Sequence, residues 1–508
     1  MGQFGYFGWS GIIKFNVPAL SRISLDASSE LPIYKQLADS IRVSIEQGAL
    51  RPGERLPATR ELAGELGLNR ATVSAAYALL EQSGLLQGHV GRGSFVAQRG
   101  SETSGFAFDW DGVLPEIEQS SVTPEHIAIS FATSRPAKEE FPLPEFRRLS
   151  KEVIDSEGAA DILQLGSAYG YEPLRRYLLA RATEEQTARA SDDLMITNGC
   201  QQGLDLLARL LAPSGHKVLM EDPVYHGLPR VFQRAGATIC PVSIDANGMD
   251  VDAVAGLLQR HRPCVLVVTP NFQNPTGATL SLERRRRIVD LAQRFGVILV
   301  ENDVYGELRY LGRDLPSLKQ LDESGNTILL RSYSKVSFPG LRVGWVLAPR
   351  PVIMRLVEAK QICDLHSDQL SQAVLLRFAE SGELTRHLER TRAAGRERVQ
   401  ALADACAAHL PVGTTFLRPE GGMNLWLELP APLTAHALLA RAEELGVSFL
   451  PGSFFSAGRP HPRGLRISFG GLPPGRITRG IQLIGEAARA VLGTHSAQWN
   501  HEPAAALV

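Results

Sequence analysis

The stretch from Ser332 to Arg342 brings together residues that could carry out one specific chemistry. It reads Ser-Tyr-Ser-Lys and, seven residues after the lysine, has an arginine; it directly follows the apolar run Thr327–Leu330, which predicts a buried strand. The amine of Lys335 can form an imine with an aldehyde. Ser332, Ser334 and Arg342 can hold a phosphate through charge-assisted hydrogen bonds. A lone lysine is usually a surface residue, but this combination predicts an aldehyde cofactor that carries a phosphate.

A glycine-containing turn before an expected helix offers a second contact for the phosphate. Gly199, Cys200 and Gln201 follow a strand-like run, Leu194–Thr197, and open a helix expected over residues 202–211. Backbone N–H groups at the N-terminus of a helix bind anions. Such a turn is also ordinary loop structure, so this segment supports pyridoxal phosphate only in combination with the lysine.

Two further residues suit the ring of pyridoxal phosphate. Tyr225 could place its aromatic face against the pyridine ring, although an isolated tyrosine is more often a core or surface residue. Asn274 lies in a loop after the expected buried strand Val265–Thr269, where its amide could donate to the phenolic oxygen of the cofactor. The Asn-Pro and Gly277 in this loop are also simply favourable turn chemistry.

The elements that must position these residues alternate along the chain after residue 128. Short apolar runs are interspersed with longer helical patterns. Such alternation predicts a mainly parallel sheet with helices on both faces. The expected strands include Val265–Thr269, Val297–Val300, Thr327–Leu330 and Gly344–Leu347, and the expected helices include Leu282–Arg294 and Gln369–Glu380.

Residues 56–84 have the pattern of two short helices that meet at an angle. Apolar residues recur at helical spacing on both sides of a three-residue turn at 67–69. Asn69 is a plausible N-cap of the second helix, which places Arg70 and Thr72 at its exposed N-terminal end. In a helix-turn-helix these positions reach bases and phosphates in the major groove of DNA.

A glycine-rich hairpin follows the two helices. Leu85–Gln87 and Ser94–Val96 are strand-like, and the tip between them carries Arg92 and Gly93. This order predicts a winged helix. A small helical bundle whose arginines are merely solvated is the alternative, and the hairpin together with Arg60 shifts the balance toward DNA binding.

The N-terminal motifs resemble the GntR-type winged helix over about residues 31–97. They are Pro-Ile-Tyr at 32–34, G-x-L-x-P-G-x-x-L-P-x-x-R from Gly48 to Arg60, then N-R-A-T-V and G-R-G-S-F-V. The resemblance implies a double-stranded DNA operator as partner. It implies contacts to this DNA from Arg60, Arg70, Thr72, Arg92 and Gly93.

The segments around the lysine resemble the class I/II aminotransferases of the type I pyridoxal-phosphate fold, over about residues 128–490. With the winged helix in front, the whole chain resembles the MocR family of regulators, which implies a homodimer. The resemblance implies that Lys335 is the Schiff-base lysine and that Asn274 and Tyr305 contact the phenolic oxygen. It implies that Arg466 binds a substrate carboxylate; a salt-bridged surface arginine is the alternative.

The chain departs from the aminotransferase pattern at the residue that meets the pyridine nitrogen. In the family an aspartate, commonly three residues before the phenol-binding tyrosine, keeps this nitrogen protonated. Here that spacing falls on Asn302, and Asp303 comes one residue late, before Tyr305. Successive residues of a strand point to opposite faces, so Asp303 can serve only if the strand has ended or bulged. If Asn302 occupies the site, transamination is expected to be slow; relatives with a shorter spacing leave both assignments open.

A second departure concerns the tyrosine that in the family reaches the phosphate of the neighbouring subunit. Five residues before Gly170, where this tyrosine is expected, the chain has Leu165. Tyr169 or Tyr171 could substitute, or the contact is missing.

The composition is that of an ordinary globular protein. The chain has 508 residues, 53 Lys and Arg against 54 Asp and Glu, and 44% hydrophobic residues, so any DNA binding must come from a local patch. The five cysteines form no Cys-x-x-Cys pair, which predicts neither a zinc site nor a disulfide framework. No apolar run is long enough to span a membrane and no leader is recognisable, so a cytoplasmic protein without membrane contact is expected.

These observations predict an N-terminal α+β winged helix-turn-helix joined by a linker to a large α/β transferase fold with a smaller C-terminal subdomain. Residues 101–130, which include most of the linker, are acidic and contain serine but no lysine or arginine. The expected limits are 1–25 for an extension of unknown role, 26–98 for the winged helix, 99–127 for the linker, 128–495 for the large domain and 496–508 for a tail.

Three functions fit these predictions. The leading one is a transcriptional regulator in which an amino compound reacts with pyridoxal phosphate at Lys335 and changes DNA binding. The second is an active aminotransferase of amino acids with an appended DNA-binding unit, which Asn302 argues against. The third is a DNA-binding protein whose large domain is only a scaffold, which the intact Ser-Tyr-Ser-Lys and Arg342 make the least favoured.

Overall fold

The computed structural model describes residues 25–26, 29, 31–89, 93–97 and 127–499. The chain divides into two compact units, Met1–Ser120 and Ser121–Val508. Nearly all of the acidic linker expected over 99–127 lies outside the described residues, as do most of the extension and the last residues of the tail.

The described part of the small unit contains three helices followed by a two-stranded hairpin. The helices are α1 (Ile33–Glu46), α2 (Thr59–Leu66) and α3 (Arg70–Gln82), and the antiparallel strands are β1 (Leu86–His89) and β2 (Gly93–Val96). The predicted helix-turn-helix and wing are thus present in the predicted order.

Capping and packing explain why the small unit folds in this way. Helix α2 ends at Gly67, whose positive φ of 66° suits glycine, and the predicted N-cap Asn69 accepts a hydrogen bond of 2.9 Å from the N–H of Ala71. The core is formed by apolar side chains of all three helices and both strands. The fully buried members include Leu37, Ile41, Leu62, Val73 and Leu80.

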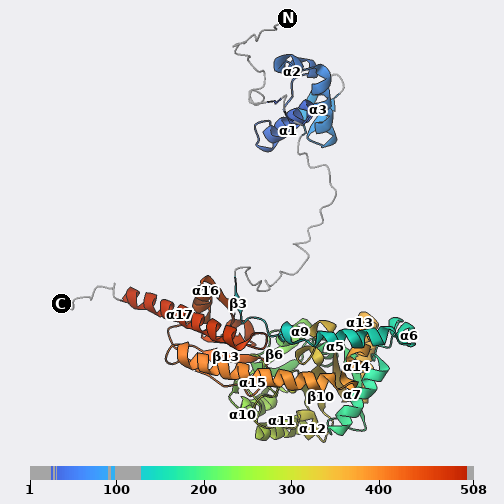
Figure 1. Cartoon of the computed structure of the whole chain (residues 1–508), viewed down its shortest axis with the longest axis vertical. Helices are drawn as coiled ribbons and strands as arrows, with labels where there is room; N and C mark the ends of the chain where they lie inside the picture. Colours follow the sequence, from blue (N-terminus) through green and yellow to red (C-terminus); the bar gives the residue numbers. More distant parts are fainter. Residues whose placement is uncertain (1–24, 27–28, 30, 90–92, 98–126, 500–508) are drawn as a thin grey trace, which may run out of the picture. The chain divides into compact units, whose positions relative to one another are not determined.

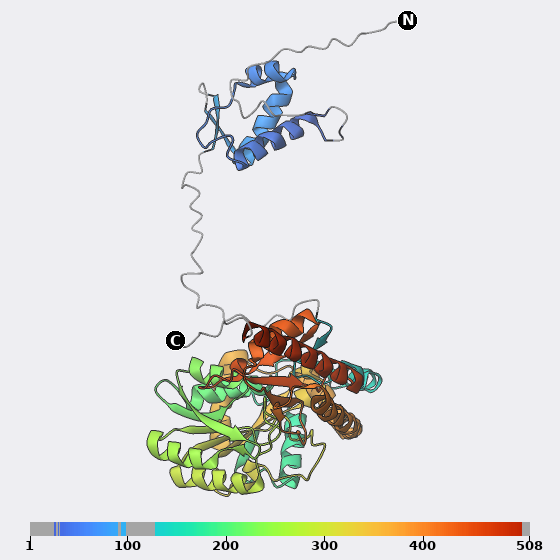
Figure 2. The same cartoon turned by 90° about the vertical axis from the view of Figure 1, so that its left-hand side faces the viewer.

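The large unit is built on an eight-stranded sheet, whose strands lie in its interior among the helices (Figure 2). The spatial order is β4-β11-β10-β9-β8-β5-β6-β7. Their bounds are β4 Asp192–Thr197, β5 Lys217–Asp222, β6 Thr238–Asp245, β7 Gly248–Met249, β8 Val265–Val268, β9 Ile298–Asn302, β10 Thr327–Ser332 and β11 Gly344–Pro349.

The central strands run parallel, as predicted, but the sheet is mixed. Strands β6, β5, β8, β9 and β10 pair in parallel, whereas β11 is antiparallel to both β10 and β4. The connection from β10 to β11 carries only short 3-10 turns, Tyr333–Lys335 and Pro339–Leu341. Because a parallel crossover needs a longer connection, this short link reverses the chain direction.

Helices cover both faces of this sheet (Figure 1). Helix α8 begins at Cys200, earlier than expected, and the expected helix Gln369–Glu380 is present with those bounds as α14. The helices of the large unit are α5 Leu143–Ile154, α6 Ala159–Leu163, α7 Glu172–Glu184, α8 Cys200–Leu211, α9 Gly227–Arg234, α10 Val251–His261, α11 Leu282–Phe295, α12 Leu318–Leu321, α13 Arg350–Asp364, α14, α15 Glu383–His409, α16 Ala435–Glu444 and α17 Pro474–Trp499.

Alternation along the strands gives the sheet two distinct apolar faces. One face, which we call the α8 face, packs against α8, α9 and α13, and the opposite face packs against α7, α10, α11 and α14. Successive side chains of a strand point to opposite faces. The α8 face includes Met195, Val267, Val300, Leu330 and Val346, and the opposite face includes Leu194, Leu266, Leu299, Leu329 and Leu347.

A smaller antiparallel sheet forms the C-terminal subdomain, with the order β12-β13-β16-β15. The long helix α15 packs against α17 beside it (Figure 1). The bounds are β12 Thr415–Phe416, β13 Asn424–Glu428, β15 Leu450–Pro451 and β16 Gly464–Ser468, and β3 (Ile129–Ser130) pairs with β14 (Val447–Ser448). Among the described helices, none is long and apolar enough to cross a membrane.

Candidate functional site

The start of α8 meets the loop after β10 at a point where only glycine fits. Gly199 has φ 76°, and a Cβ built on it would lie 2.5 Å from Nη2 of Arg342. A Cβ on Gly344 would lie 2.9 Å from the backbone N of Cys200. The first N–H groups of α8 lack partners within the helix, and Arg342 is held beside them.

Hydroxyl groups extend this cluster toward the lysine. Oγ of Ser332 lies 2.9 Å from Oγ of Ser334, and Nη1 of Arg342 lies 3.5 Å from the Ser334 hydroxyl. Nη2 of Arg342 also donates to the carbonyl of Asn198 at 3.3 Å. The structure thus brings together the two serines, the arginine and the start of α8, a combination of donors suited to a phosphate.

The amine of Lys335 lies beside a tyrosine. Its Nζ donates a 2.6 Å hydrogen bond to the carbonyl of Ser134 and lies 5.8 Å from the centre of the Tyr305 ring. The Tyr305 hydroxyl is 3.4 Å from Oγ of Ser134 and 3.5 Å from Nδ2 of Asn274. Lys335, Tyr305 and Asn274 therefore share one site, although they come from three separate loops.

Arg466, on β16 of the small sheet, reaches into the same site. Its Nη1 donates to Oδ1 of Asn274 at 3.1 Å, its Nη2 donates to the carbonyl of Ala132, and its guanidinium carbon lies 4.8 Å from the centre of the Phe455 ring. It is buried, and within the described residues its Nε has no hydrogen-bond partner. A buried guanidinium with a free donor is not a salt-bridged surface arginine; it is ready to accept an anionic group.

The electrostatics of this site follow from burial and from its cations. Burial lowers the pKa of Arg466 to about 10, which leaves it charged at neutral pH. Burial also acts to raise the pKa of Tyr305, but the nearby Lys335 ammonium, the hydrogen bond with Ser134 and the Arg466 guanidinium outweigh it, so the net pKa is lowered. The Tyr305 hydroxyl is thus a better proton donor than an ordinary tyrosine.

Two other predicted residues, Tyr225 and Cys200, border the α8 face, and Gln201 follows Cys200 on α8. Tyr225 is half-buried against its apolar cluster. Cys200 donates its thiol to the Arg331 carbonyl at 3.2 Å, and burial raises the thiol pKa to about 12, so it stays neutral. The side chain of Gln201 is exposed, which leaves only its backbone N–H for an anion.

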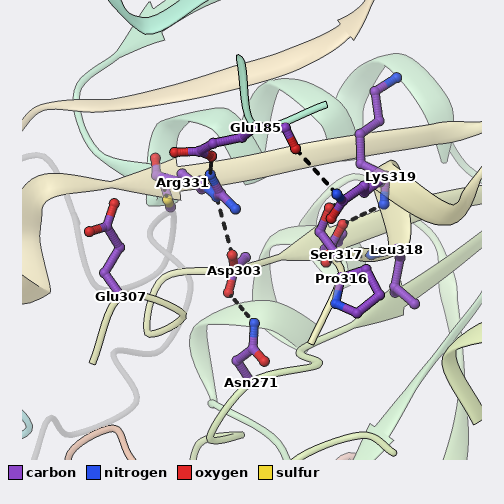
Figure 3. A network of polar contacts seen from close by, with 12 residues as sticks. Glu185, Asn271, Asp303, Glu307, Pro316, Ser317, Leu318, Lys319 and Arg331 are labelled. Carbon is purple, nitrogen blue, oxygen red and sulfur yellow. Dashed lines mark hydrogen bonds and ion pairs between the residues drawn. The ribbon is translucent and has the colours of Figure 1, made fainter. Parts of the chain in front are cut away.

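Asn302 and Asp303 have different surroundings. Asp303 accepts a 2.8 Å hydrogen bond from Nδ2 of Asn271 and lies 3.2 Å from Nε of Arg331 (Figure 3). Arg331 in turn pairs with Glu185 at 2.9 Å. Asn302 is buried, and its Oδ1 has no hydrogen-bond partner among the described residues.

Several contacts at this site were not predicted. Ser134 accepts from Lys335 through its carbonyl, which every residue has, so no sequence signal marks it. Gln202, next to the predicted Gln201, donates to Asp364 at 2.6 Å and accepts from the N–H of Asn198 at 2.8 Å, which fixes the turn before α8. The position of Gln202, a polar residue in the first turn of the expected helix, was the sequence signal that could have predicted this contact.

The residues expected to contact DNA lie at the helix ends and the wing of the small unit. Arg60 on α2 and Arg70 at the start of α3 are exposed, and Thr72 is half-buried. Gly93 opens β2 with φ 102°, and a Cβ there would lie 3.1 Å from Nε of Arg55. Arg92 lies outside the described residues.

The fold and this site define a type I pyridoxal-phosphate transferase domain on a chain that also carries a winged helix. The family described as bacterial regulatory proteins, gntR family, matches residues 33–96, and the family described as aminotransferase class I and II matches residues 129–484. The chain therefore belongs to the aminotransferase class I and II family and, through its GntR domain, to the MocR-type regulators.

The relatives include both regulators and enzymes. The probable rhizopine catabolism regulatory protein MocR of Rhizobium meliloti is 28% identical over 92% of this chain and 96% of its own. The HTH-type transcriptional regulator YdcR of Escherichia coli is 30% identical over 86% of this chain and 94% of its own. The solved α-aminoadipate aminotransferase of Thermus thermophilus, with N-(5'-phosphopyridoxyl)-L-leucine, is 34% identical, with a TM-score of 0.70, over 76% of this chain and 99% of its own.

The side chains present in this chain fit pyridoxal phosphate, the cofactor of this family. A lysine amine stands beside a cluster of hydroxyls, an arginine and a helix N-terminus. Buried polar atoms of Asn302 and Arg466 lack partners within the described residues, as expected where a bound group completes the hydrogen bonding.

Proposed function

We propose that this transcriptional regulator senses an amino compound at the Lys335 site and transmits the result to its winged helix. The observation that carries the proposal is the convergence of Lys335, Tyr305, Asn274 and Arg466 on one site of a chain that also has a GntR domain. A ligand changes DNA binding only if it favours one of two arrangements of the protein. The amino compound would act in this way by binding one arrangement more tightly than the other.

Each residue of the site has a proposed role in holding the cofactor. Pyridoxal phosphate supplies an aldehyde that reacts with amines. Lys335 would hold it covalently, and Asn274 and Tyr305 would contact its phenolic oxygen. The phosphate would lie against the N–H groups of Gly199, Cys200 and Gln201 together with Ser332, Ser334 and Arg342, and Tyr225 would border the ring.

The substrate-binding residue in this proposal is Arg466. Its charge is retained at neutral pH and its Nε is free among the described residues, so it can bind a carboxylate of the incoming amino compound. Its contact with Asn274 supports a position for this carboxylate beside the cofactor site. The effector class is therefore an amine that also carries a carboxylate.

A homodimer is part of the proposal. Apolar side chains that are more than half exposed occur at the end of α5, at and just after the end of α6, and at and just after the end of α13, namely Ile154, Leu163, Leu165, Ile362 and Leu365. Nε2 of Gln369 donates to the carbonyls of Ile162 and Gln164, so the end of α6 lies beside the start of α14. An apolar surface of this kind is suited to a second copy of the chain, and two copies would read two half-sites of a double-stranded operator.

Contacts to this operator are proposed from the exposed ends of the two recognition elements. Arg60, Arg70 and Thr72 would contact the major groove and its phosphates, and Arg92 and Gly93 would be the wing contacts. In support, Arg70 and Thr72 stand at the N-terminal end of α3, beyond its Asn69 cap.

An active aminotransferase is the second candidate. It is favoured by the likeness to α-aminoadipate aminotransferase and by the presence of Lys335, Tyr305, Asn274 and Arg466 in one site. Lys335, once released by the substrate amine, would move the proton. Asn302 in place of a carboxylate weighs against efficient turnover.

The experiment that tests the proposal records absorbance and operator binding of the full-length protein during titration with a panel of amino acids and amines. We expect a cofactor band that is lost in Lys335→Ala, and one compound that shifts both this band and the affinity for DNA. Lys151→Ala, an exposed lysine on α5, is the matched control and should behave like the wild type. Conversion of that compound to a keto acid at steady state would instead identify an aminotransferase. A band shift with no change in DNA binding would contradict the sensing role.

A further inference from the structure

Asn302 and Asp303 leave the end of β9 toward opposite faces of the central sheet. Val300 belongs to the apolar cluster of the α8 face and Leu299 to the cluster of the opposite face. Because side chains alternate, Asn302 lies on the α8 face with Val300, and Asp303 follows the direction of Leu299. The first residues of α8, which are proposed to hold the cofactor phosphate, are on the side of Asn302.

The neighbouring strand supports this assignment. Asn302 is in register with Leu330 of β10, which also belongs to the α8 face. Two residues further on, Ser332 continues on that face and contributes its hydroxyl to the phosphate cluster. Arg331, between them, points to the opposite face and pairs with Asp303 there. The cofactor cluster and the Asp303–Arg331 pair are therefore on different sides of the sheet.

The carboxylate of Asp303 is not available to a cofactor. Its two oxygens accept from Nδ2 of Asn271 and pair with Nε of Arg331, and Figure 3 shows it between these two side chains. The Asp303 side chain is only 3% exposed. Turning it to the α8 face would break both the hydrogen bond with Asn271 and the ion pair with Arg331, and would leave Arg331 with Glu185 as its remaining carboxylate partner.

The amide of Asn302, in contrast, lacks a partner for its oxygen among the described residues. It is 6% exposed, and its Oδ1 is buried without a hydrogen bond. An unsatisfied buried polar group is destabilising unless a bound group completes its hydrogen bonding. Rotation about Cβ–Cγ exchanges the amide oxygen and nitrogen, so this position can present an acceptor or a donor.

We propose that Asn302 contacts the pyridine nitrogen of the bound cofactor and that this nitrogen is unprotonated at neutral pH. An amide carries no charge to stabilise a pyridinium, whereas its NH2 group donates well to the lone pair of a neutral pyridine. This inference rests on the proposed function, since it presumes the cofactor at Lys335. It explains how the site could sense without turnover.

The consequence concerns proton removal from the bound amino compound. A neutral ring nitrogen stabilises the resulting negative charge poorly, so proton transfer by Lys335 is slow. Exchange of the amine of the ligand with that of Lys335 does not require this charge and stays fast. The chain would then bind its effector covalently and reversibly and release it unchanged, as a sensor requires.

The test uses pyridoxal phosphate labelled with 15N at the ring, bound to the full-length protein, and measures the 15N chemical shift at neutral pH. The wild type is expected to show the downfield resonance of an unprotonated nitrogen. Asn302→Asp is expected to move it upfield to the protonated position. Asp303→Asn is the matched control, one residue away on the other face, and is expected to leave the resonance where it is in the wild type.

A second readout is the single-turnover conversion of the bound cofactor to its amine form by the amino acid that binds best. Asn302→Asp is expected to accelerate this conversion at least about tenfold, the effect of one pKa unit of differential stabilisation. Asp303→Asn is expected not to accelerate it. A merely structural role of Asn302 would not move both the chemical shift and this rate in the same direction.

The outcomes separate this inference from the proposed function. A protonated ring nitrogen in the wild type overturns the inference while the cofactor stays in place, and so does a resonance that responds to Asp303→Asn but not to Asn302→Asp. A wild-type protein that takes up no labelled cofactor overturns the proposed function, and the inference with it. If either variant fails to fold, the wild-type chemical shift alone decides.

Discussion

Nη1 of Arg466 lies 3.1 Å from Oδ1 of Asn274, so one hydrogen bond joins the small C-terminal sheet to the loop after β8. The other end of the same amide, Nδ2, lies 3.5 Å from the hydroxyl of Tyr305. Asn274 therefore connects the proposed carboxylate-binding arginine with the tyrosine beside Lys335. A carboxylate bound at Arg466 would therefore act on the cofactor site through the side chain of Asn274.

Replacement of Arg466 by glutamine is expected to weaken binding of amino acids selectively. A hydrogen bond to a charged group contributes about 1.5–3 kcal/mol, which corresponds to a loss of roughly 10- to 100-fold in affinity. Simple amines without a carboxylate should bind as in the wild type. Absorbance titration of the cofactor band with an amino acid and with its decarboxylated amine measures both affinities.

The control for this prediction is Arg355→Gln, which removes an exposed arginine paired with Glu358 on α13. It should change neither affinity. Equal weakening of both ligands by Arg466→Gln would show that the arginine stabilises the site and does not select a carboxylate.

The pH dependence of stability is expected to carry the signature of Glu221 on β5. This carboxyl accepts hydrogen bonds from the N–H of Thr269 and from Gln273, but burial prevails and raises its pKa to about 8 from 4.5. Between these pH values the folded state keeps a proton that the unfolded state has lost. The free energy of unfolding should therefore fall as the pH rises, by up to about 1.4 kcal/mol per pH unit from this group.

Glu221→Gln is expected to remove this contribution because an amide does not titrate in this range. The measurement is urea unfolding of both proteins at several pH values between 4.5 and 8. The transition to be compared is that of the large unit, which contains Glu221. The free energy of unfolding of the wild type minus that of Glu221→Gln should decrease steadily as the pH rises. Glu389→Gln, an exposed position on α15, serves as the control, and a slope that is the same in all three proteins would contradict the assignment.

Much of the site could be predicted because its residues follow strand ends. Gly199 comes after β4, Asn274 after β8, Tyr305 after β9 and Lys335 after β10. The carboxyl ends of parallel strands meet at one edge of a sheet, so local motifs far apart in the chain imply a common site. The winged helix was predicted for a similar reason, because Asn69 marks the start of α3 through its own capping bond.

The remaining features depend on contacts that no local pattern encodes. Ser134 contacts Lys335 through its backbone carbonyl, which every residue has, and its hydroxyl meets Tyr305, which lies 171 residues further along the chain. The choice between Asn302 and Asp303 depends on where β9 ends and on the position of Arg331, which sits on another strand. The reversed direction of β11 follows from a short connection whose path is set by the packing of Gly344 against α8.

The buried ion pair between Lys319 and Asp192 is expected to make the stability of the large unit sensitive to substitution of either residue alone. Nζ of Lys319 lies 2.9 Å from Oδ1 of Asp192, and both side chains are 1% exposed (Figure 3 shows Lys319). Lys319→Met should destabilise the protein by about 3–5 kcal/mol because it leaves a buried charge without its partner. The double variant Lys319→Met with Asp192→Asn should regain most of this loss, since the amide can still accept from the N–H of Arg189.

Urea unfolding of the wild type, both single variants and the double variant measures the coupling between these two residues. Additive effects of the two substitutions would show that the pair does not interact in solution. Replacement of the exposed pair Lys151 and Asp155 is the control and should cost little.

Arg70 is expected to contribute to DNA binding mainly through a phosphate. It is exposed at the first position of α3, where both its own charge and the N-terminal end of the helix attract an anion. Arg70→Ala should weaken binding to a duplex selected by the wild type and reduce the slope of log affinity against log salt by about 1. Arg42→Ala, on α1 and paired with Asp39, should leave this slope unchanged. If instead Arg70→Ala changes neither affinity nor slope, the exposed start of α3 does not face the DNA, and the contacts must be sought on the wing.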